Sequence, residues 1–518
     1  MPGILKSRSM PPILALSAVA VLVVVFVLLN GGGSQGANNS GLAGYMPPDS
    51  VAYAETDLRP DGRVEAEVDQ VVRALTGRSL SASLDEALGR SKNAGIDYRE
   101  DIEPWLAGPV AISTGESRSE VGLVAEAADP DAARAFADDL IAGRDFPDTA
   151  RAEVVGDALI VASSQAWLDR MAEAFAGESL ADTEVFTNSM ADLPEGGIAS
   201  LFVSNSALLD AIETEGFAVS PVLETLGVDP EGTGTAMTLS IDSGTISLEG
   251  SSGLATEAGT TGAGDLIESF PADSLLAAGS GNVGESLGAL SDAVDQSGAA
   301  PEESAPEGSG PGSASPGTGG LLGQASAFGI DLPALIASIE SAGVFITGDS
   351  AKKMSGALVA TTSDPDQVRD SIQSISTLGA FAGGDLFRPL PGGLEGFSVS
   401  LPGMPSDRVA IATEGDRLVI ALGVKAARQG LEPGERTLGD TDLYRQAISA
   451  LSGEQVSLFA TPSVLAPLVG TKARAYKSSG NGEKAGAKRM QRLIEGIETI
   501  VAGSGEDGSF KIDIDLKD

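Results

Sequence analysis

The tetrad Ser350-Ala351-Lys352-Lys353 places a serine three residues before a lysine. In acylating enzymes with this serine-x-x-lysine pattern, the lysine can activate the serine without help from a histidine. The Ser-Asp-Asn and Lys-Thr-Gly elements that accompany the pattern in such enzymes are missing from the chain. The tetrad also falls in a predicted hairpin turn instead of at a helix start. We therefore interpret it as a polar turn, and keep a serine/lysine hydrolase or acyltransferase as the alternative.

The segment Gly279-Ser280-Gly281-Asn282-Val283-Gly284 fits the dinucleotide-binding fingerprint, in which a glycine loop places pyrophosphate at a helix N-terminus. The fingerprint requires an acidic ribose ligand about 20 residues further on. Here the chain instead enters a tract rich in Gly, Pro and Ser, and the equivalent place in the first repeat reads Asp57-Leu58-Arg59-Pro60-Asp61-Gly62. We interpret the segment as a plain loop and predict no cofactor.

Neighbouring carboxylates offer oxygen ligands of the kind that calcium prefers, at Asp138 with Asp139 and at Asp513 with Asp515. No EF-hand loop is present. Asp513 and Asp515 alternate along a predicted strand, so they share one face, which we expect to point to solvent. We predict no metal site and keep weak calcium binding as an alternative.

The 518-residue chain contains no histidine and no cysteine. These absences exclude serine-histidine triads, histidine metal sites, thiolate nucleophiles, zinc-cysteine sites and disulfides. We therefore predict no catalytic residue and no enzymatic activity.

A basic stretch lies near the C-terminus of an acidic chain, whose formal net charge is −40. Its bases are Lys472, Arg474, Lys477, Lys484, Lys488, Arg489 and Arg492. The counterpart in the first repeat, from Asp210 to Glu231, is acidic and contains no base. Three interpretations stay open: docking of an anionic envelope polymer or protein partner, pairing with the acidic counterpart, or a solvated basic surface. The net charge argues against nucleic acid as a partner.

An apolar run from Ile13 to Leu29 follows Lys6 and Arg8. As a helix it would reach roughly 26 Å, close to the thickness of the hydrocarbon core of a membrane. We predict that residues 1–12 are cytoplasmic, 13–29 span the membrane and 30–44 form a tether, with the bulk of the chain extracytoplasmic. A cleaved signal peptide is the alternative.

The rest of the chain repeats itself. Gly95-Ile96-Asp97 returns as Gly329-Ile330-Asp331, and Leu123-Val124-Ala125 returns as Leu358-Val359-Ala360. In each repeat an Asp-Pro pair follows, with Asp129 or Asp364 expected to cap a helix that begins at the proline. Further landmarks keep register, and they include a Gly-Asp turn at Gly156 and Gly415.

From these landmarks we predict two tandem, related α+β domains with largely antiparallel sheets and packed helices, behind one N-terminal transmembrane helix. The first repeat covers 45–252, a linker 253–265, and the second repeat 266–518. The second contains a disordered insertion at 296–320, rich in Gly, Pro, Ser, Ala and Glu, and a smaller insertion near Gly383 to Pro405. Trp105 and Trp167 are predicted to lie in the core, with carbohydrate stacking as the alternative.

Three segments resemble the bacterial membrane-anchored family of proteins of unknown function numbered 3352. They are Tyr45-Met46-Pro47-Pro48-Asp49-Ser50-Val51-Ala52-Tyr53, Asp57-Leu58-Arg59-Pro60-Asp61-Gly62, and Ile96-Asp97-Tyr98-Arg99-Glu100-Asp101-Ile102-Glu103-Pro104-Trp105-Leu106. The resemblance covers essentially everything after the anchor and implies an anchored, extracytoplasmic protein, without catalytic residues to transfer. We therefore predict a non-catalytic binding or structural module of the cell envelope, held in the lipid bilayer by residues 13–29.

Overall fold

The computed structural model describes residues 41–517, apart from a set of gaps. The gaps are 60–61, 77–78, 80–81, 83–96, 118, 143–148, 192, 195–196, 215–231, 254–262, 285–331, 349–352, 382–386, 401–408, 433, 452, 463–493 and 506–507. The predicted membrane span 13–29, tether 30–44 up to residue 40, and insertion 296–320 lie outside the described residues. Among the residues that the structure describes, no helix is both long and apolar enough to cross a membrane.

The first half of the described chain runs from Leu42 to Ser252. Its elements are η2 (Leu42–Tyr45), β1 (Ala52–Asp57), α2 (Gly62–Thr76), the π-helical turn η3 (Tyr98–Ile102), β2 (Leu106–Thr114), β3 (Val121–Ala127), α4 (Pro130–Ala142), β4 (Arg151–Val155), β5 (Ala158–Ala162), α5 (Gln165–Ala176), η4 (Leu180–Asp182), α6 (Glu184–Ala191), β6 (Ala199–Ser204), α7 (Asn205–Thr214), β7 (Gly234–Asp242) and β8 (Thr245–Ser252).

The second half runs from Gly264 to Leu516. Its elements are α9 (Gly264–Glu268), β9 (Ser274–Gly281), α12 (Leu332–Ala337), β10 (Ile339–Thr347), β11 (Ser355–Thr362), α13 (Pro365–Phe381), β12 (Phe387–Pro389), β13 (Glu395–Val399), β14 (Val409–Glu414), β15 (Arg417–Leu422), α14 (Val424–Leu431), η5 (Leu438–Asp440), α15 (Asp442–Ile448), η6 (Ser449–Leu451), β16 (Gln455–Ala460), β17 (Ile497–Ser504) and β18 (Ser509–Leu516).

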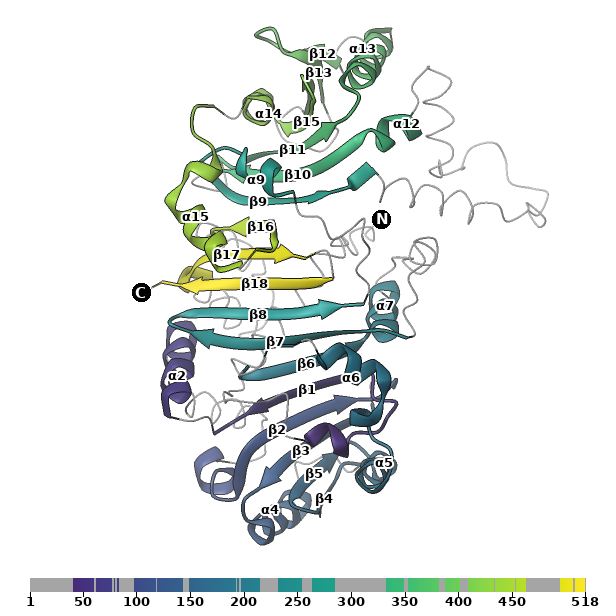
Figure 1. Cartoon of the computed structure of the whole chain (residues 1–518), viewed down its shortest axis with the longest axis vertical. Coiled ribbons are helices and arrows are strands. Elements are labelled where there is room, and N and C mark those ends of the chain that lie inside the picture. The colour runs from purple at the N-terminus through teal and green to yellow at the C-terminus, as the bar shows by residue number, and fades with distance from the viewer. Residues whose placement is uncertain are drawn as a thin grey trace, which may run out of the picture.

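All described strands belong to one sheet of 18 strands, and every pairing in it is antiparallel. In space the order is β4-β5-β3-β2-β1-β6-β7-β8-β18-β17-β16-β9-β10-β11-β15-β14-β13-β12 (Figure 1). The predicted α+β class with an antiparallel sheet is confirmed.

The repeat in the sequence is a repeat in this strand order. Strands β1 to β8 correspond in turn to β9, β10, β11, β14, β15, β16, β17 and β18, and each set pairs internally in the same pattern. We predicted a sheet in each half; instead the equivalent last strands β8 and β18 pair with each other and make the two sheets one. The boundaries of two separate domains stay a prediction.

The predicted helix caps and hairpin turns are present in both halves. The Asp129 carboxylate accepts hydrogen bonds from the backbone N–H groups of residues 131 and 132, and Asp364 accepts one from the N–H of Gln367. Gly156 and Gly415 have φ angles of 62° and 57° at their hairpin turns, where glycine adopts the left-handed region without strain. The repeated motifs are therefore caps and turns, which fix where helices and strands begin and end.

Side chains of both faces of the sheet form the core. On one face, residues of β6, β7, β8, β17 and β18 pack with α2 and α4. On the other, η2, α5 and α6 cover the first half and α9, α14 and α15 cover the second. Trp105 and Trp167 are buried, which confirms their predicted place in the core and leaves no ring face for a sugar.

Candidate interaction surface

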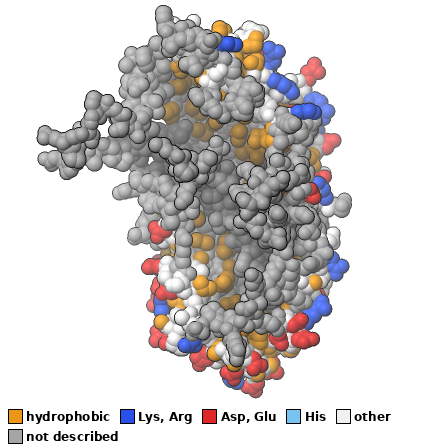
Figure 2. Space-filling view, turned by 180° about the vertical axis from the view of Figure 1, so that it is seen from behind, with side chains coloured by type: hydrophobic (Ala, Val, Ile, Leu, Met, Phe, Trp, Pro, Cys, Tyr) orange, Lys and Arg blue, Asp and Glu red, His pale blue; other side chains and the backbone are white. Residues whose placement is uncertain are grey.

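Four exposed aliphatic side chains gather on one face of the second half. Val344 on β10, Leu358 on β11 and Ile420 on β15 are direct cross-strand partners, and Leu422 follows two residues later on the same face. Their exposed fractions are 37%, 44%, 41% and 49%. We call these four residues the apolar strip. Figure 2 shows the molecule from behind the view of Figure 1, with hydrophobic side chains at the surface in its upper and its lower part.

The strip arises because its strands are apolar on both sides. The alternate residues Val359 and Val419 are fully buried beneath α14 on the opposite face. Continuous apolar strands of this kind are typical of sheets that are covered on both faces. Here one face is covered by the chain and the other remains open to solvent at four adjacent positions.

The row of strip residues continues beneath a helix. Ile420 pairs with Ile411 of β14, and Ile411 pairs with Phe397 of β13. Phe397 is buried against Val368 and Ile372 of α13. The open strip therefore begins where the cover of α13 ends.

The first half has the same row, but its side chains are half-buried. Ile112, Leu123 and Val161 are cross-strand partners on β2, β3 and β5, in the places of Val344, Leu358 and Ile420. Leu123 and Val161 pack against the core that contains Ala133 and Ala137 of α4, together with the partly buried Phe136. An amphipathic helix thus helps to cover this row in the first half.

The two rows are covered differently because the equivalent helices α4 and α13 pack on different strands. Helix α4 packs on β4 and β5, whereas its equivalent α13 packs on β12, β13 and β14. The strands β12 and β13 occupy the insertion predicted near Gly383 to Pro405, and they extend the sheet beyond β14. Because α13 follows this added hairpin outward, it reaches Leu418 of β15 but leaves Val344, Leu358, Ile420 and Leu422 open on that face.

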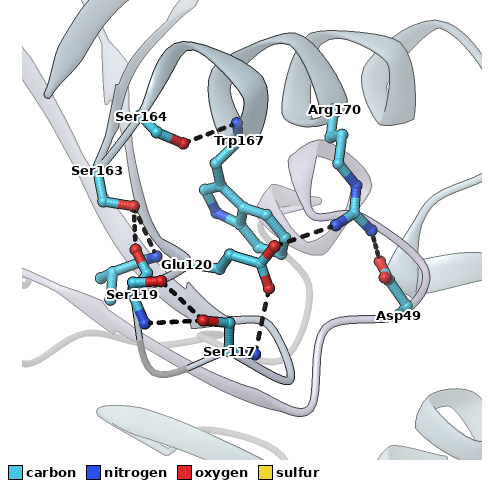
Figure 3. A network of polar contacts seen from close by, with 9 residues as sticks. Asp49, Ser117, Ser119, Glu120, Ser163, Ser164, Trp167 and Arg170 are labelled. Carbon is cyan, nitrogen blue, oxygen red and sulfur yellow. Dashed lines mark hydrogen bonds and ion pairs between the residues drawn. The ribbon is translucent and has the colours of Figure 1, made fainter. Parts of the chain in front are cut away.

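A polar network ties together three segments of the first half (Figure 3). The guanidinium of Arg170 on α5 pairs with Asp49 of the entry turn and lies 3.9 Å from a carboxylate oxygen of Glu120, in the β2–β3 turn. It also lies 4.7 Å from the ring centre of the buried Trp167, as in a cation–π contact. The side chain of Ser163 donates to the Ser119 carbonyl oxygen at 2.6 Å.

This network holds the β2–β3 turn against α5, and the second half replaces it with smaller residues. In the repeat alignment through Gly156 and Gly415, Trp167 corresponds to Ala426 and Arg170 to Gln429. Ala426 is a buried residue of α14, and a Cβ added at Gly430 of the same helix would lie 2.9 Å from a methyl group of Val419. Helix α14 therefore approaches its strands closely, and we assign the network of the first half a structural role.

The junction of the two halves carries charge on one face. Lys511 of β18 forms an ion pair with Glu249 of β8, and Ser247 of β8 donates a hydrogen bond to Asp513. Asp515 accepts hydrogen bonds from Thr245 and Thr499 at 2.7 and 2.6 Å.

We predicted that Asp513 and Asp515 face solvent, and for Asp513 this is wrong. Asp513 is buried, because β18 is a central strand covered by η6 instead of an edge strand. This burial raises the pKa of the Asp513 carboxyl, against the lowering effects of Ser247 and Lys511. Among the described residues, no group of three or more carboxylates could hold a metal ion.

The other residues singled out from the sequence do not come together into a site. Ser350 lies outside the described residues, and Lys353 is exposed at the end of the β10–β11 turn. Gly279 and Gly281 lie inside β9 and pair with β10, so the interpretation of a plain loop is wrong there, and no phosphate loop is present at these positions. Asp138 and Asp139 are exposed on α4.

The basic stretch also stays untested. Lys472, Arg474, Lys477, Lys484, Lys488, Arg489 and Arg492 lie outside the described residues, as does its acidic counterpart from Glu215 to Glu231. Only Asp210 and Glu213 of that counterpart are placed, on α7.

Comparison with known proteins identifies a family for the chain but does not indicate an activity. The family model described as protein of unknown function (DUF3352) matches residues 13–459. The chain belongs to the DUF3352 family. No curated protein matches it. The crystal form I structure of TP0453 is 10% identical with a TM-score of 0.22, and the match covers 41% of this chain and 78% of that one. Crystal form III of TP0453 is 11% identical with a TM-score of 0.17, over 74% and 92% of the two chains.

Proposed function

We propose that this DUF3352 protein is a non-catalytic binding module of the bacterial cell envelope, and that the apolar strip is its contact surface. Residues 13–29 anchor it in the membrane with the N-terminus in the cytoplasm, and the sheet lies on the extracytoplasmic side. The observation that carries the proposal is the exposure of Val344, Leu358 and Ile420 in one direct cross-strand row.

Exposure of these aliphatic side chains to water forgoes burial free energy, which contact with a partner would recover. Each buried aliphatic side chain contributes about 1.5–3 kcal/mol relative to an exposed one. The strip leaves part of that stabilisation unused at four neighbouring positions, and contiguous apolar patches on soluble domains mark interaction sites. The first half, which covers the same row with its own chain, has no such patch at those positions.

Affinity capture from the native membrane tests the proposal. The tagged, full-length protein and its Leu358→Asp variant are crosslinked in cells, and the captured species are compared. Leu443→Asp is the matched control, since Leu443 is a leucine on α15 that is 37% exposed, against 44% for Leu358. We expect Leu358→Asp to lose species that wild type and Leu443→Asp retain. Identical sets from all three proteins would contradict a binding role for the strip.

A further inference from the structure

We infer that the occupant of the apolar strip is a single amphipathic helix of a partner protein, with aliphatic residues on its contact face and acidic residues along one flank. This inference rests on the proposed function and specifies its partner. Four observations of the molecule carry it: the spacing of the strip, the helix that covers the equivalent row, the helix at the strip's border, and the charge beside its end.

The spacing of the strip matches a helical turn. Neighbouring strands lie about 4.8 Å apart, so Val344, Leu358 and Ile420 present three side chains at that interval. The pitch of an α-helix is about 5.4 Å, and its side chains at i, i+3 or i+4, and i+7 lie on one face. One short apolar helix face therefore meets all three side chains at once.

The molecule contains a template for such a contact. In the first half, the equivalent Leu123 and Val161 share a core with the Ala133, Phe136 and Ala137 face of α4. Those three residues have helical spacing, and α4 itself begins at a proline after a capping aspartate. In the first half, a face of α4 therefore belongs to the core that partly buries two residues of this row.

The strip is also continuous with a helix–sheet interface that is already formed. The same cross-strand row passes from Ile420 through Ile411 to Phe397, which α13 covers with Val368 and Ile372. A partner helix on the strip would lie beside α13 and extend its layer over β15, β11 and β10. The added helix completes the layer that the β12–β13 hairpin displaces.

The charge beside the strip favours an acidic flank on the partner. Leu422 ends β15, and its carbonyl oxygen accepts a hydrogen bond from the side chain of Ser355 at 3.3 Å. The exposed Lys425 lies three residues beyond Leu422. A carboxylate on the flank of the partner helix that faces this end of the strands would complement its charge.

Site-specific photocrosslinking in the native membrane tests the inference. A photoreactive amino acid replaces Val344, Leu358 or Ile420, one at a time, in the full-length anchored protein, and the crosslinked residues are mapped by mass spectrometry. We expect the three probes to reach one partner segment at residues three or four apart. Adding Leu358→Asp to the Ile420 probe should lower its crosslinking at least about tenfold, because the contact would then bury a charge.

A probe at Leu123 is the internal control, because it should crosslink within the same chain, to the core that it packs against. Partner residues two apart would show an added β-strand, and an acyl-chain adduct would show lipid; either result overturns the helix and leaves the proposed function intact. Crosslinking confined to a second copy of this chain would overturn a foreign partner. No crosslink at all from the three probes, with the Leu123 control positive, would overturn both the inference and the proposed function.

Discussion

The row Ile112–Leu123–Val161 in the first half and the row Val344–Leu358–Ile420 in the second have the same strands, the same pairing and the same aliphatic chemistry. They differ in cover, because α4 stays over β4 and β5 whereas α13 follows the β12–β13 hairpin outward. The comparison teaches that an insertion at the sheet's edge can leave an apolar row exposed two strands away, while the row keeps its aliphatic character.

The largest expected effect comes from the residue that holds α13 in its outward position. Phe397→Ala removes a buried aromatic ring between β13 and α13 and should cost about 3–5 kcal/mol of unfolding free energy. If α13 then moves toward β15, Leu358 should react less with a solvent-borne carbene label. Chemical denaturation and residue-level labelling measure the two effects. Unchanged stability would show that Phe397 does not hold the helix.

Truncation within the two halves should separate covered positions from open ones. Leu159→Ala, at a buried position beneath α4, should lower the unfolding free energy by about 2–5 kcal/mol. Leu358→Ala, at the open strip, should change it by no more than about 0.5 kcal/mol. Urea denaturation of the purified chain from residue 41 onward gives both values. Similar losses from the two substitutions would contradict the difference in cover.

The capping boxes provide a control in which the halves should behave alike. Ser179 and Asp182 form one box and Thr437 and Asp440 the other, and in each the hydroxyl and the backbone N–H donate to the aspartate. Ser179→Ala and Thr437→Ala should each cost about 1 kcal/mol. The hydrogen bonds lower the pKa of both aspartates, so this stabilisation should be lost as the pH falls through those values. Thermal melts from neutral to acidic pH compare the two.

The smallest expected effect concerns the junction and its dependence on pH. Burial raises the pKa of Asp513 above its unfolded value of about 3.9, so the folded state binds the proton more tightly. The stability gained from that proton is present at acidic pH and is lost as the pH rises through the folded-state pKa. Asp513→Asn should therefore gain stability relative to wild type as the pH rises toward neutrality. Lys511, Glu249, Asp515 and Glu454 are the charges that act with Asp513 there, and a constant difference across pH would mean that they already offset its burial.

Much of the fold could be predicted because its signals are local. The Asp129 and Asp364 caps and the Gly156 and Gly415 turns each depend on a few adjacent residues. The pairing of β8 with β18 could not be predicted, since it depends on two segments far apart in the chain. For the same reason, Asp513 was assigned to solvent on an alternation pattern that does not distinguish a central strand from an edge strand.

The apolar strip could not be identified from the sequence, for a different reason. The residues Leu358 to Ala360 and Leu418 to Leu422 read as apolar runs, which predict burial on both faces. The insertion near Gly383 to Pro405 was visible in the sequence, but its consequence for α13 requires the packing of that helix. A break in the repeat that adjoins two-sided apolar strands is the signal that could have identified the strip.

The most direct test of the central claim is the solvent accessibility of Leu358 in two settings. Carbene labelling is measured for the purified chain from residue 41 onward and for the full-length protein in membranes isolated from its cells, with the exposed Leu443 as the internal standard. A strip that is a contact surface should label readily in the purified chain and be protected in the membrane, together with Ile420, while Leu443 labels equally in both. Equal labelling of Leu358 in the two settings would contradict the account.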